Sequence, residues 1–216
     1  MTNARIIDAR NIESSSFPFI EIVRHIESGG IIIYPTETVY GLGGMPDKSV
    51  TEKIISWKKS SPEKPMLLLV PTRESTEALT WTQEASVLAD TFWPGPLTII
   101  LSDNDRHYPS SVRNSNGGVA VRISPHPVVE ALVKRLGSPI VSTSANMTGN
   151  DPLLDVSEMS DTKRDGLVPH EDLLVLDVGP LHYSLPSTVV DCSKGSLEII
   201  REGVISLHEI EQVILE

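Results

Sequence analysis

Apolar and polar residues alternate along this chain in patterns that switch between strand and helix periodicity. Residues 31–34 read Ile-Ile-Ile-Tyr, a β-branched and aromatic run that favours a buried strand. Apolar positions three and four apart over residues 19–26 indicate an amphipathic helix, which residues 14–16, all serine, are expected to cap and Gly29-Gly30 to end. A helix is therefore predicted to lead directly into a buried strand.

A second helix is predicted to begin at Asp47, whose carboxylate suits an N-cap. It carries Val50, Ile54 and Trp57 on one face and ends near Lys58. The same reasoning predicts further strands at residues 66–70, 97–101, 119–123, from 138, 173–177, 188–191 and 197–200, and helices at 74–79, 84–93, 127–136 and from about 206. Helices and strands alternate early and strands cluster late, which predicts a mixed, twisted α/β sheet.

Length and charge narrow the class of protein. The 216 residues can bury one sizeable core, and residues 1–216 are predicted to form a single domain because no repeat or linker divides them. A net charge of −11, from 29 acidic and 18 basic residues, argues against a broad nucleic-acid-binding surface. Polar stretches at about 103–118 and 149–166 are expected to be mobile loops.

The sequence favours a soluble protein in a reducing compartment. Its first residues lack the apolar core of a signal peptide, and no stretch reaches the roughly 18 apolar residues of a membrane span. The single cysteine, Cys192, cannot form an internal disulfide, and its apolar neighbours indicate a buried, inert thiol rather than a nucleophile. We therefore expect a cytoplasmic protein without membrane contact.

The segment after the first strand combines hydroxyls, a carboxylate and three glycines. Pro35 removes a strand hydrogen bond, and Gly41, Gly43 and Gly44 allow backbone amides to approach a ligand closely. Hairpin turns also collect threonine and glycine for their own reasons. The residues alone leave both interpretations open.

Charged and polar residues supply further candidates. Lys58, Lys59 and Lys64 gather at a predicted helix end, where they either bind phosphates or complement the helix dipole in water. Arg122 ends a predicted buried strand, so its guanidinium needs a partner, either a ligand or a structural salt bridge. Residues 142–146, Ser-Thr-Ser-Ala-Asn, hold more polar groups than a turn requires, although an Asn-capped turn is the simpler interpretation.

Common nucleotide and metal motifs are missing. No Gly-x-x-x-x-Gly-Lys-Ser/Thr and no strand-borne Gly-x-Gly-x-x-Gly occurs. One cysteine and six scattered histidines indicate no protein-held metal ion, and His126 beside Pro127 is expected to cap a helix rather than act as a base. Any nucleotide pocket must be built in another way.

Several segments occur in an order that resembles the YrdC/TsaC family, the threonylcarbamoyl-AMP synthases. The resemblance covers residues from about 20 to 203. The family's fold, which the resemblance implies for this chain, is a single open α/β sheet with flanking helices around a large concave cavity. The segments are Pro35-Thr-Glu-Thr-Val-Tyr-Gly-Leu-Gly43, Trp93-Pro-Gly-Pro-Leu-Thr98, Val119-Ala-Val-Arg122 with His126-Pro127, Ser142-Thr-Ser-Ala-Asn146, and Pro186-Ser-Thr-Val-Val-Asp191 with Arg201-Glu-Gly203.

The resemblance implies a nucleotidyltransferase. Such an enzyme joins L-threonine, bicarbonate and ATP into threonylcarbamoyl-adenylate with release of pyrophosphate, for the threonylcarbamoyladenosine modification of tRNA. It also implies Mg²⁺ held mostly by the ATP phosphates, and tRNA-modification proteins that receive the adenylate. The implied site residues are Thr38, Arg122, Thr143 and Ser187 for L-threonine, Lys58, Lys59, Ser60, Lys64, Ser144, Asn146 and Arg201 for the nucleotide, and Lys58, Ser144 and Asn146 for catalysis.

Ser60 stands where the family has an arginine. A hydroxyl cannot replace a charged, two-pronged guanidinium, although Lys59 can reach the same phosphates as a point charge. The alternative hypothesis is therefore a non-catalytic, YrdC-like paralogue that binds nucleotide or RNA. Carbamoyl-adenylate transfer, as in the related domain of hydrogenase-maturation proteins, is a third hypothesis, but it needs zinc-finger and acyl-phosphatase domains that this chain lacks. The chain ends soon after the last matched segment, which favours the short, single-domain form.

Overall fold

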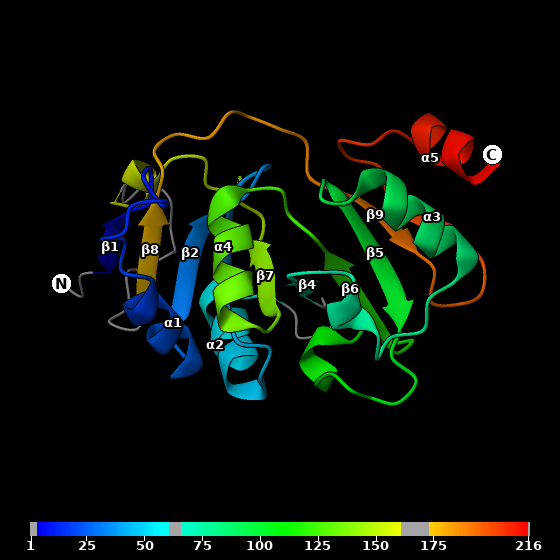
Figure 1. The fold of residues 1–216 in the computed structure, drawn as a ribbon, viewed down its shortest axis with the longest axis horizontal. Coiled ribbons are helices and arrows are strands. Elements are labelled where there is room, and N and C mark those ends of the chain that lie inside the picture. The colour runs from blue at the N-terminus through cyan, green and yellow to red at the C-terminus, as the bar shows by residue number, and fades with distance from the viewer. Residues whose placement is uncertain (1–3, 61–65, 161–172, 216) are drawn as a thin grey trace.

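The computed structural model describes residues 4–60, 66–160 and 173–215. In this part of the chain, ten strands form one sheet in the order β1-β8-β2-β3-β7-β4-β6-β5-β9-β10 (Figure 1). The strands are β1 (Arg5–Asp8), β2 (Ile31–Pro35), β3 (Tyr40–Gly44), β4 (Leu67–Leu69), β5 (Leu97–Ser102), β6 (Gly118–Arg122), β7 (Ile140–Ser144), β8 (Leu173–Asp177), β9 (Thr188–Asp191) and β10 (Glu198–Arg201). The helices are α1 (Phe19–Glu27), α2 (Lys48–Lys58), α3 (Gln83–Phe92), α4 (Pro127–Leu136) and α5 (Leu207–Leu215), with 3-10 turns at Glu74–Thr76, Ser110–Val112 and Val156–Ser160.

The sheet is mixed, as the sequence predicts. β2 runs parallel to β8 and antiparallel to β3, and β4 runs parallel to β6 and antiparallel to β7. Strands on the β8–β2 side and on the β5–β9 side point in different directions in Figure 1. The twist accumulated over many strands therefore turns one side of the sheet against the other.

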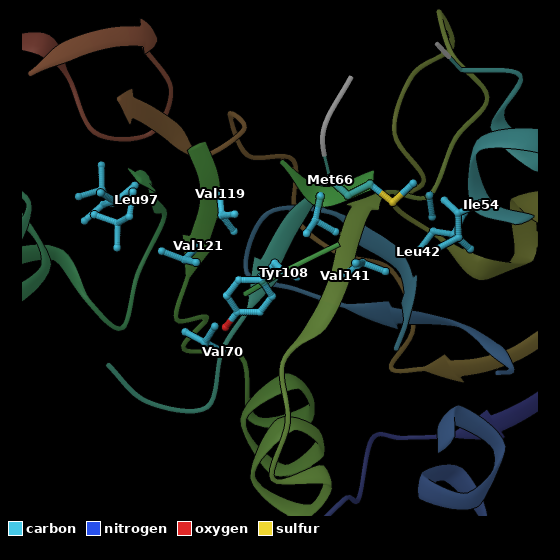
Figure 2. Close-up of a cluster of buried hydrophobic side chains, with 14 of the residues drawn as sticks. Leu42, Ile54, Met66, Val70, Leu97, Tyr108, Val119, Val121 and Val141 are labelled. Atoms are coloured by element: carbon cyan, nitrogen blue, oxygen red, sulfur yellow. The ribbon is translucent and has the colours of Figure 1, made fainter. Parts of the chain in front are cut away.

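Alternating side chains of β2 enter two hydrophobic clusters on opposite faces of the sheet. Ile31 and Ile33 belong to the cluster that includes residues of α2, whereas Ile32 and Tyr34 belong to the cluster that includes residues of α1 and α4. Figure 2 shows part of the first cluster, where Leu42 of β3 lies beside residues of α2. Because both faces are covered by helices, the apolar run of β2 has no polar alternation.

Helix ends follow the predictions in part. Asp47 caps α2, since its carboxylate accepts a hydrogen bond from the Val50 amide at 2.9 Å. The expected serine cap of α1 is wrong: the N-cap is Pro18, which makes no side-chain cap bond. Ser14 and Ser16 instead share a 2.8 Å hydrogen bond in the preceding turn, so their hydroxyls are used before the helix begins.

The glycine-rich segment is a strand of a hairpin rather than a loop against a ligand. β3 pairs antiparallel with β2, and the Thr36 hydroxyl closes the turn by donating to the Val39 carbonyl at 2.6 Å. A Cβ at Gly43 would lie 2.0 Å from the Val141 carbonyl oxygen. One at Gly41 would lie 3.0 Å from a ring atom of Tyr34. Gly43 is therefore required by close packing, because a larger residue would clash with the Val141 backbone, and Gly41 lies in tight contact with the Tyr34 ring.

Two other expectations concern loops. Residues 103–118 follow a hydrogen-bonded course, because the Asp103 carboxylate accepts from the His107 and Tyr108 amides at 2.7 and 3.0 Å. Residues 161–166 of the other stretch lie outside the described residues, and the mobility of both stretches stays a prediction. Only a 3-10 turn, Glu74–Thr76, stands where a helix over 74–79 was expected. No helix in the described residues is long and apolar enough to span a bilayer.

Candidate functional site

The predicted site residues that the structure describes fall mainly into three clusters of polar side chains. The lysine cluster lies where α2 and β7 end, the Arg122 cluster joins the β2–β3 turn to the end of β6, and the Ser187 cluster joins the start of β9 to β10. The lysine cluster is Lys58, Ser144 and Asn146, the Arg122 cluster is Glu37, Arg122 and Ser124, and the Ser187 cluster is Thr98, Ser187 and Arg201.

In the lysine cluster, a buried ammonium holds a polar turn in place. The Nζ atom of Lys58 donates to the Ser144 carbonyl at 2.5 Å, to the Asn146 carbonyl at 2.6 Å and to the Asn146 Oδ1 atom at 3.2 Å. The Ser144 hydroxyl also donates to Asn146 Oδ1, and the Asn146 amide donates to the Asn150 carbonyl, both at 2.5 Å. Although Lys58 lies far from the Ser-x-Asn segment in the sequence, its ammonium thus fixes the conformation of that segment.

This geometry brings together all three residues predicted to be catalytic. Lys58 is the last residue of α2, and Ser144 is the last residue of β7, so two element ends meet here. Strand β7 is in turn fixed by β3, with Ser144 opposite Gly41. The contact gives Lys58 a role beside the predicted phosphate contact, since it also fixes the conformation of Ser144 and Asn146.

The Arg122 cluster contains the predicted threonine-binding arginine. Arg122 Nη2 lies 2.9 Å from Glu37 Oε1, and the Ser124 hydroxyl donates to Glu37 Oε2 at 2.6 Å. The expected salt bridge of a buried arginine is therefore present. Thr38 follows Glu37 in the same turn, is buried, and its hydroxyl lies 3.1 Å from that of Thr36. The arginine and Thr38 are consequently brought to one region.

The contact between Glu37 and Arg122 depends on the shape of the whole sheet. β3, β7 and β4 lie between β2 and β6, so these two strands would be about 19 Å apart in a flat sheet at about 4.8 Å per spacing. The ion pair nevertheless joins the loop after β2 to the last residue of β6. The twist of the sheet closes this gap.

The Ser187 cluster holds the remaining predicted threonine contact beside a predicted nucleotide contact. Ser187 is buried, and its hydroxyl lies 3.0 Å from that of Thr98. The Arg201 guanidinium donates to the Ser187 carbonyl at 2.8 and 3.2 Å. Burial lowers the pKa of Arg201, and the positive charge of Arg122 lowers this pKa further. The two arginines therefore share one electrostatic environment, which an anion would stabilise.

The end of α2 departs from the usual pattern. Lys59 has φ 48°, a left-handed conformation in which glycine is the common residue. Its amide donates to the Ser56 carbonyl at 3.2 Å, and the Ser60 amide donates to the Ile55 carbonyl at 3.1 Å. Lys59 is exposed and Ser60 is half-buried. Both residues thus close the helix, and their contact with phosphates stays a prediction.

Other predicted residues have simpler outcomes. His126 caps α4 as expected, because its Nδ1 atom accepts from the Val128 amide at 3.2 Å, and burial lowers its pKa. Cys192 is buried, and burial raises the pKa of its thiol to about 11, so the inert-thiol interpretation is confirmed. Thr143 is half-buried in β7, and Lys64 lies outside the described residues.

Sequence reasoning missed Glu37 and Ser124 as members of the site. Glu37 lies in the hydroxyl-rich turn after β2, where a carboxylate among threonines is a signal. No spacing rule pairs it with Arg122, however, because the partner lies 85 positions further on and four strands away in the sheet. Only the folded sheet reveals the pair.

These features define a mixed α/β protein with clustered cationic and hydroxyl side chains suited to small anionic ligands. A family model for Sua5, YciO and YrdC proteins, whose description reads "Telomere recombination", matches residues 24–203. The chain belongs to this Sua5/YciO/YrdC family, and the resemblance found in the sequence is confirmed.

Relatives include two proteins named threonylcarbamoyl-AMP synthase. The one from Marinobacter nauticus is 38% identical over 143 residues, which cover 64% of this chain and 75% of that protein. The one from Pyrococcus abyssi is 30% identical over 194 residues, which cover 88% of this chain and 55% of that protein. The chain thus spans little more than half the length of the archaeal relative.

The fold is also that of a solved relative. The crystal structure of P. abyssi Sua5 complexed with L-threonine is 27% identical to this chain and superposes with a TM-score of 0.85. The match covers 99% of this chain and 61% of that one. The predicted fold, a single-domain twisted mixed sheet with flanking helices, is therefore confirmed.

Proposed function

We propose that this chain is a threonylcarbamoyl-AMP synthase that forms L-threonylcarbamoyl-adenylate and pyrophosphate from L-threonine, bicarbonate and ATP. The observation that carries the proposal is the buried Arg122 paired with Glu37, the residue before Thr38, because a guanidinium joined to a hydroxyl-rich turn suits the carboxylate and hydroxyl of threonine. The names of the two synthases and the threonine bound by P. abyssi Sua5 support it.

In the proposed reaction, different clusters bind the amino acid and the phosphates. The threonine nitrogen bonds to the bicarbonate carbon with loss of water, and an oxygen of the resulting carbamate then displaces pyrophosphate from the α-phosphorus. Arg122, with Thr38, Thr143 and Ser187, would hold the amino acid. Lys58 and the Ser144 and Asn146 groups that it organises would hold the phosphates, so that the attacking and leaving oxygens lie in line.

ATP brings Mg²⁺ in this proposal. Among the described residues, no group of three or more His, Cys, Asp or Glu side chains is placed to hold a metal ion. The donors found here are an ammonium, hydroxyls and amides, which suit phosphate oxygens rather than a cation. Mg²⁺ would therefore be held mainly by the phosphates, and Arg201, Lys59, Ser60 and Lys64 would complete the nucleotide contacts.

The product would pass to other proteins that modify tRNA. The adenylate is a mixed anhydride and therefore labile, so it must be used soon after it forms. We accordingly include a cytoplasmic protein that accepts the adenylate in the proposal. With a net charge of −11, the chain offers no general attraction for tRNA itself.

One observation favours a second candidate, a binding-only paralogue. Ser60 replaces the family arginine, and the exposed Lys59 that would compensate is held in a left-handed helix end. Such a protein would bind ATP or RNA without forming the adenylate.

A direct assay separates the two. The purified protein is incubated with ATP, Mg²⁺, ¹⁴C-bicarbonate and L-threonine, and labelled adenylate and pyrophosphate are quantified. We expect both products in equal amounts, and neither when any one substrate is omitted. ATP binding without product would support the binding-only candidate and contradict the proposed synthase.

A further inference from the structure

The Arg122 cluster leaves hydrogen-bonding capacity unused inside the protein. Arg122 and Glu37 lie in contact, yet the Arg122 Nε atom and the Glu37 Oε1 atom, both buried, have no hydrogen-bond partner among the described residues. Buried polar atoms are otherwise nearly always paired. Glu37 Oε1 still has its ion-pair contact with Arg122 Nη2, whereas Arg122 Nε has no hydrogen-bond partner of its own in the described part of the chain, which indicates a site that is complete only with a ligand.

The ion pair is not needed to hold the strands that carry it. β2 is fixed by hydrogen bonds to β3 and β8, and β6 by hydrogen bonds to β4 and β5. The turn that carries Glu37 is closed by Thr36. The ion pair is therefore not required for the backbone arrangement. Its effect is to fix the direction of the Arg122 guanidinium.

Charge explains why the guanidinium needs fixing. Arg122 lies close enough to Arg201 for its charge to lower the pKa of that residue, so the two cations repel. Glu37 is held on its other oxygen by the Ser124 hydroxyl at 2.6 Å, which gives the carboxylate a fixed position. Ser124 lies two residues after the end of β6 and is itself buried.

We propose that Glu37 is a positioning residue for ligand binding: held by Ser124, it orients Arg122 so that the remaining edge of the guanidinium faces the carboxylate of the amino-acid substrate. This inference rests on the proposed function for the identity of the amino acid. The guanidinium of Arg122 carries five donors in a rigid fork, so it binds a carboxylate well only in the right orientation. Setting that orientation requires both the charge and the position of the Glu37 carboxylate.

The test is to compare Glu37→Gln, which keeps the shape and loses the charge, with Glu37→Asp, which keeps the charge on a shorter stem. Calorimetry measures binding of L-threonine and, separately, of ATP. We expect Glu37→Gln to weaken threonine binding by roughly tenfold or more, with ATP binding within about twofold, and Glu37→Asp to recover part of the loss. Glu130→Gln, which breaks an exposed ion pair with Lys134 on α4, is the matched control and should change neither.

A second readout needs no ligand. The NMR signal of the Arg122 Nε–H group, assigned by its loss in Arg122→Lys, should shift and broaden in Glu37→Gln but not in the control. Unchanged threonine binding, or an equal loss of ATP binding with a lower melting temperature, would overturn the inference. If the wild type binds no threonine, the proposed function fails, and the NMR signal still decides the role of Glu37: an unchanged signal overturns it and a changed one supports it.

Discussion

The lysine cluster and the Arg122 cluster show two ways of placing a cation inside this protein. Lys58 donates three hydrogen bonds to oxygens of Ser144 and Asn146. Arg122 instead faces one carboxylate, and its buried Nε atom has no partner in the part of the chain that the structure describes. The first arrangement is complete within the chain and the second is not. The difference indicates that Lys58 mainly organises its neighbours, whereas Arg122 is held ready for a ligand.

The largest effect is expected at the lysine cluster. Lys58→Ala removes the ammonium and its three hydrogen bonds to the Ser144–Asn146 turn, two of them to backbone carbonyls, and Asn146 Oδ1 keeps only the Ser144 hydroxyl. Each charge-assisted contact contributes about 1.5 to 3 kcal/mol, so adenylate formation should fall by at least about a hundredfold. The rate of pyrophosphate release measures this, with circular dichroism as the control for folding. Activity above about a tenth of wild type would move the phosphate site away from this helix end.

A smaller and more selective effect is expected at the Arg122 cluster. Arg122→Lys keeps the charge but loses the fork, so the KM for threonine should rise about ten- to hundredfold. The KM for ATP should change by less than about threefold, because the phosphates are held elsewhere. Steady-state kinetics with each substrate varied in turn checks the split. A change confined to ATP would place Arg122 at the wrong end of the pocket.

The substrate itself probes the hydroxyls between the clusters. Valine should compete at least about tenfold less well than threonine, because it has no hydroxyl to exchange hydrogen bonds with the polar site formed by Thr38, Thr143 and Ser187. Serine keeps the hydroxyl and lacks one methyl group, a loss of about 1 kcal/mol, so it should be intermediate. Competition against labelled threonine gives the ratios, and equal use of valine and threonine would contradict the assignment.

The two clusters also differ in how far the sequence reveals them. Lys58 and the Ser-x-Asn segment were assigned to the site through their resemblance to the family's motifs, whereas Asp47, which caps α2, was predicted from its residue type. The partner of Arg122 was not, because the twist of the sheet joins strands that four spacings separate. For Gly41, Gly43 and Gly44 the sequence left open a hairpin and a close approach to a ligand, and the structure has the hairpin, in which these glycines lie in strand β3 and the first two pack against Tyr34 and Val141. Local chemistry is readable in the sequence, and contacts made by sheet twist are not.

Lys59 lies between Lys58 of the lysine cluster and Ser60, which replaces the family arginine. Its left-handed backbone allows the effect of its charge to be separated from the effect of its conformation. Lys59→Gly relieves the left-handed conformation and should raise the free energy of unfolding by about 1 kcal/mol, whereas Lys59→Ala should not. If the Lys59 charge helps to bind phosphates, both variants should lower adenylate formation by a similar factor, about three- to tenfold. Thermal melts and initial rates measure the two effects. Unchanged rates in both variants would mean that the Lys59 charge takes no part in binding the phosphates.

The smallest effect is expected at Ser60, where the synthase and binding-only hypotheses separate. Ser60→Arg adds a third cation beside Lys58 and Lys59. Once two cations neutralise the triphosphate, a third adds little, so the rate of adenylate formation should rise by no more than about threefold. The Ser60 amide bond to Ile55 involves only the backbone, so the helix end should survive the change. Initial rates of wild type and Ser60→Arg, measured at saturating threonine and varied ATP, give the comparison. A silent wild type that gains activity in Ser60→Arg would instead show that the missing guanidinium, rather than the arrangement around Lys58, limits this protein.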